Sequence, residues 1–159
     1  MQSKVFEGKS GEGRIHFLRL DKGEELVATL KDYCQQEKVA LGQINGLGAV
    51  GSFVVGLFEP EKKEYLSGEH EGAFEIVGLT GNVTKMKGQT YLHLHASFAD
   101  QENKVWGGHL NEAWISATGE IWISEICGAG VEDVDREFSE EIGLNLLKFE
   151  NWERIKIDD

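Results

Sequence analysis

The sequence has few of the residues that mark disulfide-linked or membrane-spanning proteins. Among 159 residues there are two cysteines and one proline. Cys34 and Cys127 do not form a CxxC pair, which favours reduced thiols in the cytoplasm. No run of about 18 apolar residues is present, so no membrane-spanning helix is expected. Residues 1–7 lack the apolar core of a signal peptide, and we therefore predict a cytoplasmic protein without membrane contact.

Basic residues are also scarce. Lysine and arginine number 16 against 28 aspartates and glutamates, for a formal net charge of -12. Proteins that bind DNA or RNA neutralise phosphates with clustered basic side chains. The longest basic run here is the pair Lys62 and Lys63. The charge balance therefore disfavours direct binding of nucleic acid by this chain.

The residues that are present suit one globular domain made mostly of strands. The chain is 40% hydrophobic and has 20 glycines, which mark turns and close approaches. Apolar and polar residues alternate in residues 14–20 and in short runs from 39 to 126, the period of strands. In residues 24–37 the apolar side chains instead recur at spacings of three and four residues. This period predicts one amphipathic helix with Glu24 and Glu25 in its first turn. We predict an α+β fold, an antiparallel or mixed β-sheet curled over one main helix.

Residues 46–51 match the glycine spacing of a dinucleotide-binding loop, GxGxxG. Such a loop binds pyrophosphate only when a helix N-terminus follows it. Residues 52–58 are β-branched and aromatic and stop at Pro60, which predicts a strand. We therefore reject nucleotide binding and predict a tight passage between two strands at these glycines. A further glycine-flanked loop is expected at residues 68–72, with His70 in solvent.

The end of the chain differs in composition from the rest. Residues 131–141 are rich in acidic side chains, among them Glu132 and Asp133, and predict a solvated helix or loop. Residues 142–149 are apolar enough to pack on the core. We divide the chain into an N-terminal segment 1–13, a domain 14–127 and an acidic C-terminal extension 128–159 that packs back on the domain.

Three of the five histidines lie close together in the sequence. His93 and His95 are two residues apart in an alternating run, so on a strand their side chains point to the same face. A second strand through residues 105–110, paired antiparallel with the first, would bring His109 beside them. Three neutral imidazoles that leave a coordination position open are typical of a zinc site that binds water or a small anion. Partly buried histidines that only form hydrogen bonds are the alternative interpretation.

Other polar residues have less specific roles. Cys34 lies on the apolar stripe of the expected helix, and we interpret it as a small core residue. His16, inside the first strand, is interpreted as a structural or a surface histidine. If the histidines hold a metal, a nearby carboxylate could act as a general base or orient an imidazole. The sequence offers four candidates for that role, namely Glu75, Asp100, Glu112 and Glu125.

Six short motifs occur in a fixed order along residues 14–127. They are RLDKGEEL at 19–26, GLGAV at 46–50, FEI at 74–76, LTGNV at 79–83, LHLH at 92–95 and GGHL at 107–110. In this order they resemble the plants-and-prokaryotes conserved (PPC) domain family, also called PD1-like and associated by name with DNA binding. The resemblance implies an antiparallel sheet with one principal helix, a homotrimer, and a divalent-metal site at His93, His95 and His109.

The same resemblance limits what can be expected of DNA binding. In plant relatives the domain mediates trimerisation and partner contacts, while a separate AT-hook with an Arg-Gly-Arg-Pro core binds DNA. This sequence has no such hook, and Ala73 stands where plant members tend to carry a basic residue.

Two functions remain, and a third is less favoured by the sequence. The first is a homotrimeric module with a regulatory or interaction role, whose three-histidine site binds a divalent metal, most simply zinc, or a small ligand, which could lie at the metal. The second is a metal-dependent enzyme acting on a small substrate, whose catalytic residues the sequence does not identify. The third is direct DNA binding. A cupin also uses two closely spaced histidines and a later one, but the helix at 24–37 and the missing proline-glycine motif argue against that fold.

Overall fold

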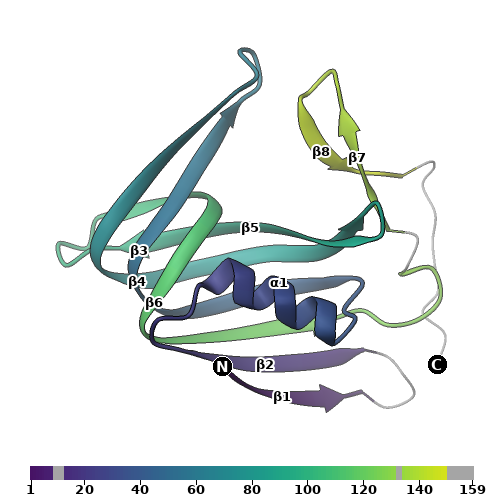
Figure 1. The fold of residues 1–159 in the computed structure, drawn as a ribbon, viewed down its shortest axis with the longest axis horizontal. Helices are drawn as coiled ribbons and strands as arrows, with labels where there is room; N and C mark the ends of the chain where they lie inside the picture. Colours follow the sequence, from purple (N-terminus) through teal and green to yellow (C-terminus); the bar gives the residue numbers. More distant parts are fainter. Residues whose placement is uncertain (9–12, 132–133, 150–159) are drawn as a thin grey trace.

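The computed structural model describes residues 1–8, 13–131 and 134–149. Its main feature is a six-stranded sheet in the order β1-β2-β6-β3-β4-β5, in which β5 also pairs with β6 (Figure 1). The elements of this sheet and its helix are β1 (Gln2–Glu7), β2 (Arg14–Asp21), α1 (Leu26–Gln36), β3 (Gly42–Glu59), β4 (Glu64–Met86), β5 (Gln89–Ala99) and β6 (Val105–Glu125). Two further strands, β7 (Arg136–Ser139) and β8 (Leu144–Leu147), form a separate hairpin.

The predicted curled sheet with one main helix is confirmed in its outline. Every pairing between the described strands is antiparallel, so the mixed alternative does not apply. Strand structure predominates and the helix is short, and the α+β class therefore describes the chain only loosely. Within the described part of the chain, that helix is not long enough to cross a bilayer.

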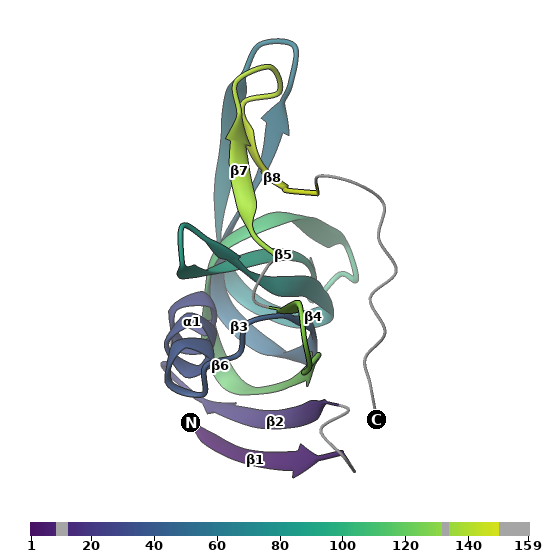
Figure 2. The same ribbon diagram turned by 90° about the vertical axis from the view of Figure 1, so that its right-hand side faces the viewer.

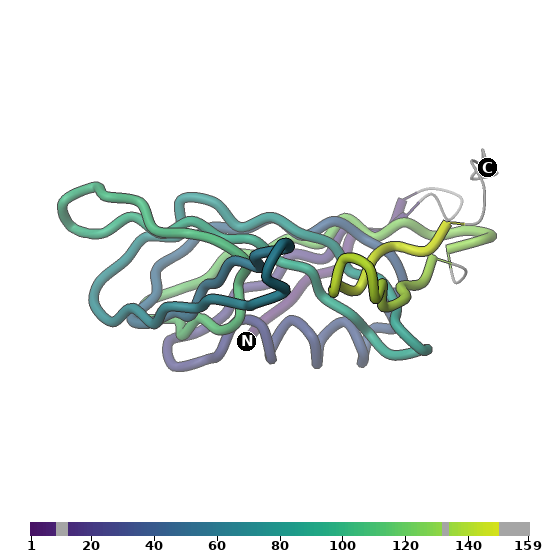
Figure 3. The backbone as a smooth tube through the Cα atoms, turned by 90° about the horizontal axis from the view of Figure 1, so that it is seen from above, coloured from purple at the N-terminus to yellow at the C-terminus, as the bar shows by residue number. Residues whose placement is uncertain are grey.

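The extra pairing between β5 and β6 closes β3, β4, β5 and β6 into a ring of strands. Inside the ring, Phe53 stacks on Phe98 with ring centroids 3.9 Å apart and meets the edge of Phe74 at 4.9 Å. The helix covers one side of the sheet, as Figures 2 and 3 show from two directions. The core thus lies between the curled sheet and α1, and the outer face of the ring is left free to carry polar side chains.

The helix buries the apolar stripe that its period predicts. Leu26, Leu30 and Cys34 are fully buried, which confirms Cys34 as a core residue. Burial raises the pKa of the Cys34 thiol to about 12, so it is not a reactive thiolate. The expectation that two glutamates occupy the first turn is wrong. Glu25 is the N-cap, and its carboxylate accepts hydrogen bonds from the Val27 and Ala28 amides instead.

The strands are longer than the glycine positions suggested. The predicted passage between strands at residues 46–51 is wrong, because β3 runs through it as one strand with register shifts. The predicted loop at 68–72 is wrong for the same reason, since β4 continues through it and His70 stacks on Phe53 with centroids 4.7 Å apart. Glycines in these strands allow bulges and close backbone approach rather than chain reversal. The rejection of nucleotide binding agrees with the strand that follows residue 51.

The C-terminal extension contains a hairpin where a helix or loop was expected. β7 and β8 pair antiparallel and are joined by a turn at residues 140–143. Glycine allows this turn, because Gly143 has a φ of 86°. The hairpin approaches the tip of the β3–β4 hairpin, where Lys63 Nζ donates to the carbonyl of Glu140 at 2.7 Å. The predicted residues Glu132 and Asp133, and the end of the extension at 150–159, lie outside the described residues.

Candidate metal centre

Strand β5 places two histidines on its outer face. Leu94, Ala96 and Phe98 point into the core and are at most 6% exposed. The alternate positions face outward, where His93 is half-buried and His95 is exposed. Alternation of apolar and polar residues therefore decides which side of the sheet the imidazoles occupy.

The turn between β5 and β6 brings the third histidine to the same place. His109 is the direct cross-strand partner of His95. Asp100 holds the turn, because its carboxylate accepts hydrogen bonds from the Glu102 and Lys104 amides at 2.9 and 3.0 Å. The register and the turn together put His109 beside the imidazoles of the preceding strand.

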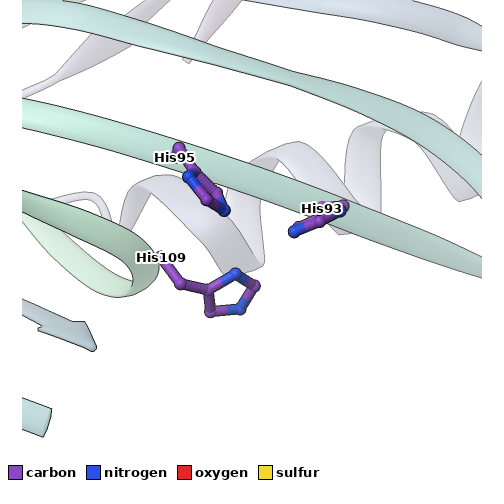
Figure 4. A group of neighbouring side chains, drawn as sticks. All are labelled: His93, His95 and His109. Carbon is purple, nitrogen blue, oxygen red and sulfur yellow. The ribbon is translucent and has the colours of Figure 1, made fainter. Parts of the chain in front are cut away.

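His93, His95 and His109 form a compact group, which we call the histidine cluster (Figure 4). The ring centroids lie 5.1 Å apart for the first two, 5.2 Å for His93 and His109, and 5.6 Å for His95 and His109. One nitrogen from each ring lies within 4.8 Å of the others. Bonds of about 2.0–2.1 Å to one tetrahedral zinc would bring the nitrogens to within about 3.4 Å of one another. The donor set thus fits a divalent metal.

The surroundings keep two of these imidazoles in the form that binds metal. Burial lowers the pKa of His93 to about 4, with smaller contributions from the charges of His109, Arg136 and His95. Burial also lowers the pKa of His109, and the charge of His95 adds to this. Because metal coordination needs a neutral imidazole, both side chains are ready to bind at neutral pH without losing a proton.

A tyrosine from the β3–β4 hairpin stands beside the cluster, and the sequence did not indicate it. The Tyr65 ring meets the His109 ring edge-on, with centroids 6.2 Å apart. Its hydroxyl donates to Asn111 Oδ1, two residues beyond His109 on β6. Gly56 lies under this ring, and a side chain there would collide with it. No local pattern predicts this contact, because it depends on how two distant strands cross.

The four candidate carboxylates do not join the histidine cluster. The described residues that could share a metal there are the three histidines alone. Asp100 serves the β5–β6 turn and accepts from Trp106 Nε1 at 3.3 Å. Glu75 and Glu112 are exposed on β4 and β6. The expectation that one of these carboxylates supports the histidines is therefore not met by the described contacts.

The fourth carboxylate, Glu125, belongs to a separate buried network. It accepts hydrogen bonds from Arg14 Nε at 2.7 Å and pairs with His16 Nε2 at 2.8 Å. His16 is fully buried and shares its other nitrogen with the Tyr33 hydroxyl at 2.9 Å. Burial would raise the pKa of Glu125, but the bonds from Arg14 and His16 hold it below its ordinary value. This network joins β2, α1 and β6, which confirms His16 as a structural residue.

A shallow open groove of about 480 Å³ lies next to His95. Asn45, Thr80 and Ser97 line it, together with the backbone of Gly107 and Gly108. Leu79 and Ala96 complete the lining, so the groove combines apolar surface with a few neutral hydrogen-bonding groups, as small-molecule sites commonly do.

A family model matches most of the chain. The model of the Plants and Prokaryotes Conserved (PCC) domain covers residues 7–127. Two curated relatives also match, the bifunctional GlmU proteins of two Synechococcus strains. The chain is 30% identical to them over 119 and 118 residues, which are 73% and 72% of this chain but 18% and 17% of theirs. The chain thus spans less than a fifth of the length of these relatives.

Three solved structures share the whole fold. A putative DNA-binding protein from Bacteroides thetaiotaomicron has a TM-score of 0.80 at 30% identity, covering 94% of this chain and 99% of its own. A metal-containing protein from Archaeoglobus fulgidus has a TM-score of 0.79 at 30% identity, with the same coverage. A plant- and prokaryote-conserved protein from Pyrococcus horikoshii has a TM-score of 0.77 at 32% identity, covering 98% of this chain and 96% of its own.

Proposed function

Because the chain belongs to the Plants and Prokaryotes Conserved domain family, we propose that it is a homotrimeric module that binds a divalent metal. The proposed ligands are His93, His95 and His109, and zinc is the first candidate because it favours histidine nitrogen in sites of this kind. The observation that carries the proposal is the convergence of three imidazole nitrogens within 4.8 Å. The metal-containing relative from Archaeoglobus fulgidus supports it at 30% identity.

The role proposed for this metal is to bind a small ligand in a regulatory or interaction protein. A bound divalent metal would supply a Lewis acid with coordination positions left open by three protein ligands. The groove beside His95, lined by both polar and apolar groups, gives a small molecule a surface on which to lie. Hydrolytic chemistry usually also needs a general base within hydrogen-bond reach, and among the described residues no carboxylate joins the cluster. This favours the binding role over the enzymatic one.

Direct DNA binding is less well supported. Some relatives carry that function in their names, but the net charge of this chain is -12. A field of that sign repels a polyanion over a screening length of roughly 8 Å at physiological salt. The proposed location stays cytoplasmic, as the cysteine content suggests.

The metal proposal is tested by elemental analysis of protein purified without an affinity tag. The wild-type chain should contain about one metal ion per chain when supplied with zinc, as expected for one three-histidine site. The double variant His93→Ala/His95→Ala should retain less than a tenth of that content. His70→Gln is the matched control, because it removes a histidine outside the cluster and should leave the content unchanged. Equal metal content in all three proteins would refute the proposal.

A further inference from the structure

The hairpin beyond the family match contributes a buried arginine next to the histidine cluster. Arg136 is the first residue of β7 and is 6% exposed. Figure 2 shows β7 rising from the level of β5 and β4. The guanidinium lies over the Tyr91 ring, with its central carbon 4.8 Å from the ring centroid. Tyr91 precedes His93 by two residues and so shares its face of β5.

Every hydrogen bond from this guanidinium goes to a neutral group. Nε donates to Thr84 Oγ1 at 2.8 Å, Nη1 to the carbonyl of Asn145 at 2.9 Å, and Nη2 to Asn82 Oδ1 at 3.0 Å. Among the described residues no carboxylate oxygen lies within 4.0 Å of it. A guanidinium has five N–H groups, and these bonds use three of them. Among the residues that the structure describes, this buried positive charge therefore has no acidic partner.

That charge lies beside the metal position. Asn82, which accepts from Arg136, is the direct cross-strand partner of His93. The charge of Arg136 is also one of the influences that lower the pKa of His93, after burial and the charge of His109. The arginine and the cluster thus occupy neighbouring positions on one face of the sheet.

The local charge balance then calls for an anion. Three neutral imidazoles do not offset a divalent cation, and Arg136 adds a further positive charge in a partly desolvated place. Buried charges are costly unless they are paired. The four carboxylates that might have supplied the pairing lie elsewhere or are engaged elsewhere, as the contacts of Asp100 and Glu125 show. None of the described residues supplies the compensating negative charge at this place, and an anionic ligand would supply it.

We infer that this site takes an anionic ligand, a carboxylate or a phosphate monoester, and that Arg136 supplies the charge that selects it. The inference rests on the proposed metal-binding function and adds the chemical class of the ligand. Both anions suit arginine, whose planar N–H groups match their oxygen atoms. Because Arg136 lies outside residues 7–127, this preference depends on the chain's own extension.

The test compares anion binding in cobalt(II)-loaded protein, using the visible spectrum of the metal to follow each titration. Acetate and phenyl phosphate are the anionic probes, and imidazole is the neutral one. Arg136→Gln should weaken both anions by at least ten-fold and leave imidazole unchanged. The probe whose affinity falls more between the wild type and Arg136→Gln identifies the preferred class of anion, carboxylate or phosphate monoester.

A second variant covers the case in which Arg136→Gln does not fold. Asn82→Asp keeps the arginine and places a carboxylate against it at the 3.0 Å contact. It should also weaken the two anions by about ten-fold, because the guanidinium is then paired internally. Gln101→Glu is the matched control, since it adds the same charge at an exposed position in the β5–β6 turn, outside the groove and away from the Arg136 contacts. It should weaken acetate by less than three-fold.

The outcomes separate the two proposals. If wild-type protein takes up no cobalt, the metal-binding function and the anion inference both fail. If cobalt binds and Asn82→Asp or Arg136→Gln retains wild-type affinity for both anions, Arg136 only attaches the hairpin to the sheet and the inference alone is overturned.

Discussion

In the histidine cluster, burial moves the pKa of His93 far from that of an ordinary histidine. Its pKa falls from 6.5 to about 4, mainly because the half-buried imidazole is poorly solvated when charged. The same burial that prepares the ring for a metal therefore makes the metal-free chain sensitive to acid.

This sensitivity has a defined direction. Between pH 6.5 and about 4 the unfolded chain protonates His93, whereas the folded chain does not. Protons thus bind the unfolded state preferentially, and the free energy of unfolding decreases as pH falls through this window. Urea unfolding of metal-free protein at pH 7 and pH 5 should show a larger loss of stability for the wild type than for His93→Gln. An equal loss in both proteins would contradict the assigned pKa.

The sequence predicted the histidine cluster but not the side chains around it. His93 and His95 follow from the period of two, and His109 from one antiparallel turn, so local rules suffice for all three. Tyr65 and Arg136 reach the cluster from hairpins whose direction depends on the packing of distant strands. The residue patterns of these hairpins do not predict the direction in which each hairpin points.

At the scale of elements, β3 and β4 are longer strands than the sequence predicts, so the predicted strand ends are wrong. Glycines at 46, 48, 51, 68 and 72 predict turns or passages between strands, but β3 and β4 continue through them. A glycine inside a strand often marks a bulge or a close backbone approach, and sequence alone does not distinguish these cases from a turn. The single helix is predicted correctly from the sequence, because its buried apolar stripe extends over the whole element.

One of these close approaches supports the histidine cluster directly. An added Cβ at Gly81 would collide with the His93 carbonyl on the neighbouring strand. Gly81→Ala should therefore displace the backbone of β5, lower stability by about 1–3 kcal/mol, as overpacking commonly does, and weaken zinc binding. Thermal unfolding and zinc titration would measure the two effects.

Gly68→Ala is the control for this prediction. It lies on the same strand, and its added Cβ would meet no atom closer than 3.6 Å. It should leave zinc affinity unchanged. If Gly81→Ala also binds zinc like the wild type, the backbone contact does not position His93.

At the scale of the whole molecule, β1, β2 and β6 carry a group of exposed apolar side chains on one face of the sheet. Phe6 and Ile15 are cross-strand partners on β1 and β2 and are 60% and 49% exposed. Phe17, 43% exposed, stacks on Trp122 with centroids 6.2 Å apart. Contiguous apolar surface of this kind often marks a protein interface, and this supports the proposed homotrimer.

The trimer proposal predicts a sedimentation mass of three times the 17.7 kDa of one chain. Phe17→Lys should shift the wild-type species toward the single-chain mass, because it places a charge in the apolar face. Phe138→Lys, on the β7–β8 hairpin and 56% exposed, is the control and should sediment like the wild type. A wild-type protein that sediments at the mass of one chain would refute the trimer.

The most direct test of the central claim is an anomalous difference map from zinc-loaded crystals, recorded at the zinc absorption edge. The account predicts one strong peak bounded by one nitrogen from each of His93, His95 and His109, at the about 2.0–2.1 Å expected for zinc and imidazole. A map with no peak among these three side chains at full zinc supply would contradict it.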